Sequence, residues 1–284
     1  MKNILVTGAN GQLGNEMRVL SAENKEYNYF FTDVAELDIC NKEAVMAFVK
    51  ENNINVIVNC AAYTAVDKAE DNAELCTKLN CNAVGYLAEA ATANDAGFIQ
   101  ISTDYVFDGT NHLPYKESDP TCPNSVYGVT KLAGEAKASA YCKKTMIIRT
   151  AWLYSTFGNN FVKTMIRLGK EREALGVVFD QIGSPTYARD LARAIFAAID
   201  KGIVPGIYHF SNEGVCSWYD FTKSIHRIAG ITTCKINPLH TDEYPAKAPR
   251  PHYSVLDKSK IKTMYGIAIP YWEESLEECI KDLK

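Results

Sequence analysis

The chain has 284 residues, of which 47% are hydrophobic and 23% are charged, and its formal net charge at pH 7 is −4. These values are typical of a soluble globular protein with one large domain or two ordinary ones. No basic tract is present, which argues against nucleic acid or an anionic membrane as the main partner and favours a small molecule.

In the first half of the chain, short apolar runs alternate with longer periodic segments. Apolar runs bounded by turns, with helices between them, indicate a parallel sheet covered on both faces. We therefore predict a doubly wound, Rossmann-like α/β domain over residues 1–150. The predicted strands are 3–6, 29–32, 56–59, 98–102 and 146–149, and the predicted helices are 14–21, 42–52, 71–93 and 125–141.

Beyond residue 151 the pattern is less regular. The proline-rich segment 240–253 is expected to be a loop, either a linker or a substrate flap. We expect residues 186–210 to return to the Rossmann-like domain, and residues 151–185 and 211–284 to form a smaller carboxy-terminal substrate-binding domain. Helices are predicted at 159–173, 187–198, 218–229 and 272–283, and strands at 176–179 and 206–210.

The nine cysteines are scattered, with no C-x-x-C pair and no histidines at zinc spacing. We therefore expect free, mostly buried thiols in a reducing compartment rather than a disulfide or metal framework. The first strand is predicted to begin almost at Met1, which leaves no room for a signal peptide, and no apolar run approaches the roughly 18 residues of a membrane span. A cytoplasmic protein is expected.

A glycine-rich segment follows the first predicted strand and opens the first helix. Glycine at every third position allows a tight turn and a close approach to a pyrophosphate, and the start of the helix offers free N–H groups to phosphates. This position predicts a dinucleotide site. Its residues are Gly8, Asn10, Gly11, Gln12, Leu13 and Gly14.

An acidic residue is expected about 20 residues after the glycine loop, where it would hold the adenosine ribose. Asp33 lies there; it favours NADH without excluding NADPH, and the alternative is a turn aspartate. Asp38, with Ile39 beside it, is expected either to face the adenine or, as a cap, to begin the helix at Lys42.

Tyr127 and Lys131 are four residues apart in a predicted helix, so their side chains share one face. A neighbouring ammonium favours the phenolate and lowers the tyrosine pKa, which is about 10 in the free residue. Such a tyrosine can exchange a proton near neutral pH, which suits redox chemistry at a C–OH/C=O centre. A half-buried tyrosine and a solvated lysine are the alternative, but the strand-end Thr103 and the dinucleotide loop favour catalysis.

Together these pieces resemble the extended short-chain dehydrogenase/reductase superfamily over nearly the whole chain. The matches are G-x-x-G-x-x-G at residues 8–14, Asn59-Cys60-Ala61-Ala62, Thr103, and Y-x-x-x-K at residues 127–131. Within it, longer ordered matches resemble the dTDP-4-dehydrorhamnose reductase family; they lie at residues 61–70, 102–107, 127–135, 149–154, 158–161 and 180–186. The resemblance implies NADH- or NADPH-dependent reduction of the C4 keto group of dTDP-4-dehydro-6-deoxy-L-mannose to dTDP-L-rhamnose.

The same resemblance implies roles for single residues. Tyr127 would protonate the sugar C4 oxygen, Thr103 would hydrogen-bond it, and Lys131 would bind the nicotinamide ribose. Asn80 resembles the asparagine that helps a proton relay in this superfamily. The alternative is that its side chain lies on the helix surface. Ala61, Ala62, Tyr63 and Thr64 are expected to contact the cofactor, and Thr103, Asp104, Trp152, Asn159, Gln181 and Arg250 the dTDP-linked substrate. For Trp152, core packing is the alternative.

Some members of the family hold a magnesium ion between the subunits of a homodimer through glutamates. Glu16 matches one such position, but Arg189 stands where another glutamate is expected. A cation does not replace a metal ligand without changing the interface, which argues against Mg²⁺ and against a metal-dependent dimer; a homodimer of another kind stays open.

Three other functions share parts of this sequence pattern. Sugar-nucleotide dehydratases carry an Asp-Glu pair after the threonine, whereas Asp104 is followed here by Tyr105, which argues against dehydration. A nucleotide-sugar 4-epimerase of the superfamily shares the tyrosine and lysine and stays open. A non-catalytic dinucleotide-binding subunit, like the regulatory subunit of methionine adenosyltransferase, is disfavoured because Thr103, Tyr127 and Lys131 are all present.

Overall fold

The computed structural model describes residues 1–283, and its centre is a parallel sheet of six strands in the order β10-β5-β4-β3-β1-β2. The strand order reverses between β1 and β3, and in open α/β sheets ligands bind at the carboxyl ends of the strands at such a point. The predicted doubly wound sheet is confirmed. Its strands are β1 (Lys2–Thr7), β2 (Tyr27–Thr32), β3 (Val56–Asn59), β4 (Gly97–Thr103), β5 (Thr145–Thr150) and β10 (Gly206–His209).

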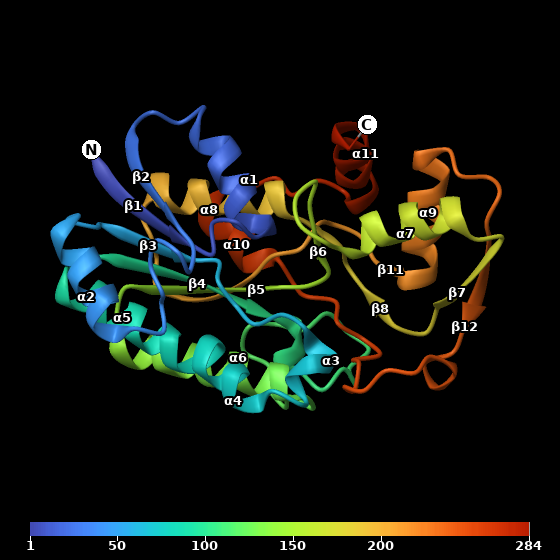
Figure 1. The fold of residues 1–284 in the computed structure, drawn as a ribbon, viewed down its shortest axis with the longest axis horizontal. Helices are drawn as coiled ribbons and strands as arrows, with labels where there is room; N and C mark the ends of the chain where they lie inside the picture. The colour runs from blue at the N-terminus through green and yellow to red at the C-terminus, as the bar shows by residue number, and fades with distance from the viewer. Residues whose placement is uncertain (284) are drawn as a thin grey trace.

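Helices cover both faces of this sheet (Figure 1). One face carries α1 (Gln12–Ser21), α8 (Ala188–Lys201) and α10 (Ser259–Tyr265), and the other carries α2 (Lys42–Glu51), α5 (Ala83–Ala93) and α6 (Val126–Tyr141). Successive strand residues point to opposite faces, so Ile4 and Val6 join the first core while Leu5 joins the second. Strands buried on both faces therefore appear in the sequence as continuous apolar runs.

The helix predicted at residues 71–93 is interrupted. The chain forms α3 (Val66–Ala69) and α4 (Ala73–Thr77), then a π-helical turn at Lys78–Asn82, and only then α5. A π-helical turn inserts an extra residue and is frequent at functional sites. Here the turn carries Asn80, which is buried.

A second, smaller hydrophobic core lies beside the sheet, to the right in Figure 1. Pro238 removes a donor from β12, which explains why that strand was not predicted. The other missed strands have only two residues each and carry no periodicity. The core is built by α7 (Phe161–Glu171), β7 (Ala174–Val178), α9 (Trp218–Ala229), β12 (Lys235–Leu239) and α11 (Trp272–Asp282), and the short strands are β6 (Leu153–Tyr154), β8 (Ile182–Gly183), β9 (Thr186–Tyr187) and β11 (Cys216–Ser217).

Segments from late in the chain also pack on the large sheet. β10 forms one edge of it, α8 covers one face, and α10 packs against both through Ile261 and Tyr265. The division into two domains stays a prediction. The residues of helix α10 were predicted within the substrate-binding domain, but the helix packs on the large sheet of the Rossmann-like domain.

Two expectations from composition can be compared with the fold. All nine cysteines are free, and six of them are buried. Within residues 1–283, no helix has the length and apolar character that crossing a membrane requires.

Candidate active site

The glycine loop turns at the carboxyl end of β1, where the strand order reverses. Gly8 has a φ of 64°, and a Cβ at this residue would lie 2.6 Å from the backbone nitrogen of Ala61. A Cβ at Gly14 would lie 2.5 Å from the Cα of Ala9. Glycine at these two positions therefore lets the loop close on α1 and on the segment after β3.

The start of α1 is suited to bind an anion. The helix begins at Gln12, and its N-cap residue Gly11 supplies no side-chain hydrogen bond to the first free N–H groups. Asn10 and Gly11 are exposed, whereas Leu13 is buried in the core. The predicted loop residues thus divide into a surface that fits a pyrophosphate and a packed base beneath it.

Asp33 lies beside this loop at the end of β2. One of its carboxylate oxygens accepts a hydrogen bond from the backbone of Asn10 at 3.1 Å, and the other accepts one from Val34 at 2.9 Å. The carboxylate is therefore next to the loop, as a ribose contact requires.

Asp38 and Ile39 follow in the next turn. Asp38 is exposed and accepts a hydrogen bond from the backbone of Cys40, while Asn41 caps α2 through Ala44. The alternative in which Asp38 caps this helix is therefore wrong. The Ile39 side chain is buried in the core, and a cofactor contact at either residue stays a prediction.

Tyr127 lies in the first turn of α6, and Lys131 lies one turn later. Ser125 caps the helix by accepting a hydrogen bond from the backbone of Gly128 at 3.1 Å. A Cβ at Gly128 would lie 2.3 Å from the carbonyl oxygen of Tyr105, so this glycine permits close contact with the chain after β4. The predicted helical spacing of the pair is confirmed.

The electrostatics of the pair differ from the prediction. Burial raises the pKa of Tyr127 well above its ordinary value, while the neighbouring Thr103 hydroxyl opposes the shift. Burial lowers the pKa of Lys131 to about 8, and its ammonium donates to the Ile101 carbonyl at 2.6 Å. The prediction of a lowered tyrosine pKa is wrong, because desolvation raises it. A raised pKa keeps the phenol protonated at neutral pH, which suits a proton donor.

Asp104 follows Thr103 at the end of β4 and is buried with it. One carboxyl oxygen of Asp104 accepts a hydrogen bond from the Thr103 hydroxyl at 3.0 Å, whereas the other has no partner within residues 1–283. Burial raises the pKa of this carboxyl to about 7. A buried polar atom without a partner is uncommon, and next to Thr103 it fits a contact with a sugar hydroxyl.

Arg250 reaches the same place from the proline-rich loop. Its guanidinium donates to the Tyr105 hydroxyl at 3.2 Å and to Asp67 at 2.6 Å, and the Tyr105 ring packs edge-on against Tyr127. Arg250 was predicted to lie in the site, whereas its contacts with Tyr105 and Asp67 were not predicted. A contact of Arg250 with phosphate stays a prediction.

Asn80 supports the loop after β3. Its side chain accepts a hydrogen bond from the backbone N–H of Tyr63 at 2.8 Å and donates to the Tyr63 carbonyl at 3.1 Å. It also donates to the hydroxyl of Thr130 at 3.3 Å. Asn80 is buried, so its helix-surface alternative is wrong. It ties the Ala61–Thr64 segment to α6.

Trp152 forms an aromatic stack with Trp218, with ring centroids 3.6 Å apart. Its φ of 49° is rare for a non-glycine residue, and it remains partly exposed. One face of the indole thus packs on the smaller core, and its role as a wall for the sugar stays a prediction. The stacking of Trp218 on Trp152 was not predicted, because Trp218 has the sequence pattern of an ordinary core residue of α9.

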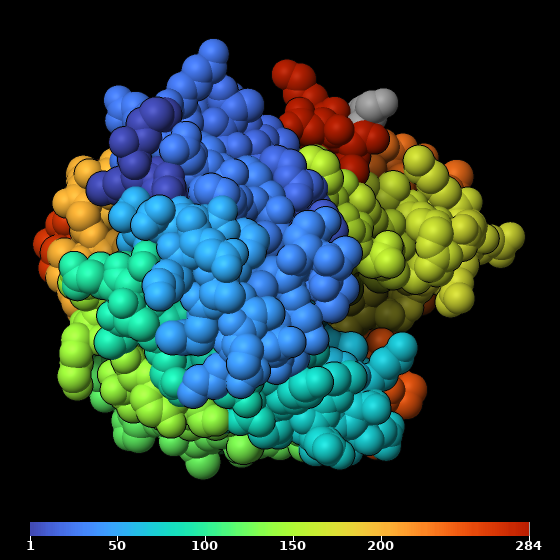
Figure 2. Space-filling model, turned by 60° about the vertical axis from the view of Figure 1, so that its left-hand side comes forward, coloured from blue at the N-terminus to red at the C-terminus, as the bar shows by residue number. Residues whose placement is uncertain are grey.

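The two amides predicted to meet the substrate lie in different surroundings. Gln181 is buried and donates to the Thr241 hydroxyl at 3.2 Å, whereas Asn159 is exposed. The neighbouring Asn160 caps α7 and donates to Gln12 at 3.0 Å, which links the smaller lobe to the glycine loop. Figure 2 shows the blue amino-terminal segments meeting the yellow-green and yellow segments of that lobe. The roles of Asn159 and Gln181 stay predictions.

Glu16, which matches a metal-ligand position of the family, is bound by Arg189 instead. Glu16 is fully buried and accepts hydrogen bonds from Arg189 at 2.9 Å and from Ser155 at 2.6 Å. Arg189 also donates to Asp282 at 2.6 Å and to Glu278 at 3.4 Å. The guanidinium already supplies the positive charge that these carboxylates require, so the residues do not fit a divalent cation bound at Glu16.

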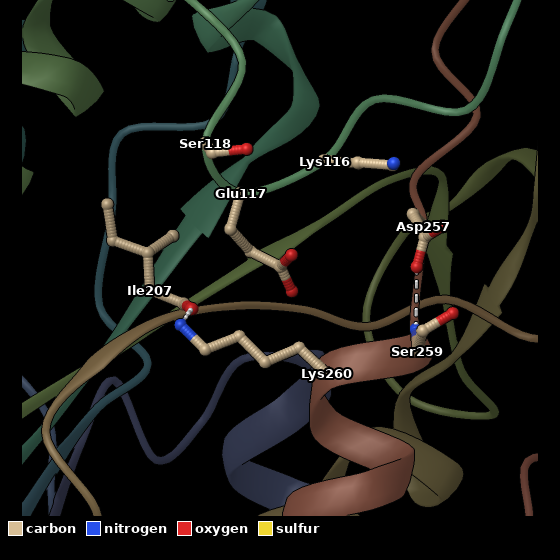
Figure 3. A pocket seen from close by; sticks show the side chains of 7 residues that line it. All are labelled: Lys116, Glu117, Ser118, Ile207, Asp257, Ser259 and Lys260. Atoms are coloured by element: carbon tan, nitrogen blue, oxygen red, sulfur yellow. Dashed lines mark hydrogen bonds between the residues drawn. The ribbon is translucent and has the colours of Figure 1, made fainter.

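A cavity of about 610 Å³ lies away from these residues (Figure 3). The Lys260 ammonium at its edge donates to the carbonyl of Ile207 at 2.6 Å, and Ser259 donates its backbone N–H to Asp257. None of the predicted site residues lines it, so we do not assign the chemistry to it. Its lining is Lys116, Glu117, Ser118, Ile207, Asp257, Ser259 and Lys260.

Comparisons with known proteins agree with this geometry. The family described as RmlD substrate binding domain matches residues 1–284. The dTDP-4-dehydrorhamnose reductase of Aggregatibacter actinomycetemcomitans is 42% identical over 98% of each chain. A crystal structure of a dTDP-4-dehydrorhamnose reductase from Clostridium acetobutylicum is 47% identical over 99% of each chain, with a TM-score of 0.95. That of Bacillus anthracis in complex with NADP is 40% identical over 99% of this chain and 100% of its own, with a TM-score of 0.94. The chain belongs to the RmlD substrate binding domain family, together with these reductases.

Proposed function

We propose that this protein reduces the C4 keto group of dTDP-4-dehydro-6-deoxy-L-mannose to give dTDP-L-rhamnose, with NADH or NADPH as the reductant. The observation that carries the proposal is the position of Tyr127 beside Thr103, at the carboxyl ends of the strands, where the glycine loop also lies. The names of the relatives supply the sugar, because two of the similar proteins are dTDP-4-dehydrorhamnose reductases at 40% identity or more over almost the whole chain.

The reaction adds one hydride and one proton across the C4 carbonyl. The glycine loop would hold the pyrophosphate of a reduced nicotinamide dinucleotide, which would supply the hydride. Thr103 hydrogen-bonds the carbonyl oxygen and orients it, and Tyr127 transfers its phenolic proton to that oxygen as negative charge develops there. Lys131, on the same helix face, holds the nicotinamide ribose hydroxyls with its ammonium. The partnerless oxygen of Asp104 accepts a hydrogen bond from a sugar hydroxyl.

The choice between the two cofactors depends on Asp33. A carboxylate in this position accepts hydrogen bonds from the ribose hydroxyls of NADH and repels the 2′-phosphate of NADPH. The related Bacillus anthracis structure, however, contains NADP. We therefore propose that both cofactors are used, with Asp33 shifting the preference toward NADH.

The test is to incubate purified protein with the keto sugar nucleotide and either cofactor, and to follow oxidation of the cofactor by its ultraviolet absorbance. Product analysis by mass spectrometry separates the alternatives, because reduction adds two hydrogen atoms whereas a 4-epimerase leaves the mass unchanged. Binding of cofactor without oxidation of either one contradicts the reductase and supports a binding module.

A further inference from the structure

A buried ion pair lies one helical turn beyond Lys131. Glu135 is 4% exposed and Arg149 is 2% exposed. The guanidinium of Arg149 donates two hydrogen bonds to the carboxylate of Glu135, at 2.9 and 2.7 Å. Ser102 donates a third at 2.5 Å. The carboxylate therefore joins α6 to both β4 and β5 at one point.

Three consecutive residues of β4 each interact with a residue of α6. The carbonyl of Ile101 accepts from Lys131, Ser102 binds Glu135, and Thr103 interacts with Tyr127. Arg149 lies directly opposite Ser102 in the paired strand β5. The position of the helix along the strand is thus fixed by the same contacts that place the lysine.

Stability alone is a poor reason for such a pair. Burying two charges costs several kcal/mol of desolvation, and apolar residues of similar size can replace buried ion pairs without loss. Other parts of the interface between α6 and its neighbours use small and apolar residues, among them Val84, Ala138 and Cys142. A charge in this place calls for another explanation.

We propose that Glu135, held by Ser102 and Arg149, is a positioning residue of the enzyme: it fixes Lys131 against β4 and preserves the positive charge of its ammonium. The inference rests on the proposed function, in which Lys131 holds the nicotinamide ribose. Glu135 touches neither cofactor nor substrate and acts through the lysine.

The charges around Lys131 support this role. Burial lowers the lysine pKa to about 8, and Glu135 is the largest influence that opposes the decrease. Cys76 from α4 and Cys60 from the segment after β3 oppose it too, but burial raises the pKa of the Cys60 thiol to about 12, so this group is neutral at working pH. Loss of an adjacent opposite charge lowers a lysine pKa by about one unit or more. Lys131 without Glu135 is then less protonated than in the parent at the same pH.

The experiment measures the dissociation constant of NADPH against pH, from neutral pH to about pH 9.5, without substrate. In the parent, affinity falls as Lys131 loses its proton, with a midpoint near pH 8. The double variant Glu135→Gln/Arg149→Met leaves no charge unpaired, and its midpoint is expected below that of the parent, because Glu135 is the member of the pair that raises the Lys131 pKa. The control Arg167→Met/Glu171→Gln removes an exposed i,i+4 pair in α7 and leaves the midpoint in place.

A folded double variant with the parent midpoint overturns the proposal, and so does a parent whose affinity does not change over this range. If the double variant does not fold, Glu135→Asp tests the proposal, because it keeps the charge but shortens the side chain by one methylene. A lower pH midpoint of NADPH affinity in this variant supports the role of Glu135. A midpoint equal to that of the parent overturns it. A parent that binds NADPH with the expected profile but does not reduce the keto sugar contradicts the proposed function and leaves Glu135 in its role.

Discussion

The ring of Tyr105 stands edge-on to the ring of Tyr127, with centroids 5.5 Å apart and planes at 78°. Tyr105 also accepts a hydrogen bond from Arg250, which is bound in turn to Asp67. Tyr127, the proposed proton donor, is therefore supported by a chain of contacts that ends in the proline-rich loop. Tyr105 is thus a packing residue that also fixes a loop.

Tyr127→Phe removes the proton donor and retains the ring that packs against Tyr105. We expect NADPH affinity within about threefold of the parent and a loss of kcat of about 10²–10⁴-fold, since general acid catalysis contributes in that range. Single-turnover reduction of the keto sugar nucleotide measures the loss. A variant that keeps turnover within about threefold of the parent shows that another group donates the proton.

Asp67→Asn weakens the attachment of the proline-rich loop, because Asp67 holds both Arg250 and the backbone N–H of Ala248. We expect KM for the sugar nucleotide to rise by about five- to tenfold, which corresponds to about 1–1.4 kcal/mol of lost loop placement. The change in stability should be under about 1 kcal/mol, because the Asp67 side chain is 46% exposed.

A matched control lies in the same loop. Lys247 pairs with Asp71 on the surface, and both side chains are more than half exposed. Lys247→Gln should leave KM and kcat unchanged. If it raises KM as much as Asp67→Asn does, general tethering of the loop explains the effect and the placement of Arg250 does not.

The ion pairs of Arg189 predict that divalent cations change neither the activity nor the thermal stability of the protein. The guanidinium occupies the space between Glu16, Glu278 and Asp282, so activity and Tm should be the same in EDTA and in Mg²⁺. Arg189→Glu leaves the buried Glu16 without its partner, which costs about 3–5 kcal/mol, and the new carboxylate should make Tm rise on addition of Mg²⁺. Sedimentation of the parent with and without Mg²⁺ shows whether any dimer depends on the metal. Inactivation of the parent by EDTA would contradict this account.

Much of the fold could be predicted from local patterns. The inner strands β3 and β5 of the large sheet are buried along their whole length, so their apolar runs stand out in the sequence, and the glycine loop marks the end of β1. β12 could not be predicted because Pro238 interrupts it, and its pairing with β7 depends on a residue separation of about 60. The π-helical turn at Asn80 depends on contacts with Tyr63 that no periodicity shows.

Within the candidate site, contacts between residues that are close in the sequence could be predicted, whereas contacts between distant residues were missed. Tyr127 and Lys131 share a helix face by spacing alone. The pair of Asp67 and Arg250 spans 183 residues, and neither residue type indicates the other. The pKa of Tyr127 was predicted in the wrong direction because the extent of burial is a property of the packed structure.

Asp104 makes a prediction about pH and stability. Burial raises its folded pKa to about 7 from an unfolded value of 3.8, so between these values the folded protein binds more protons than the unfolded chain does. The free energy of unfolding contributed by this group therefore decreases as pH rises from about 4 to about 7, by at most about 4 kcal/mol. Asp104→Asn removes the ionisation and should stabilise the protein relative to the parent at pH 8 but not at pH 4.5.

The measurement is urea unfolding of both proteins across this range, with the difference in free energy of unfolding plotted against pH. Other titrating groups affect both proteins equally, so the difference isolates Asp104. One such group is His209, because burial lowers its pKa to about 3. A difference that stays constant with pH would show that the carboxyl is already ionised at pH 5. In that case the partnerless oxygen carries a full charge in the free enzyme, and a sugar hydroxyl would meet an anion there rather than an acid.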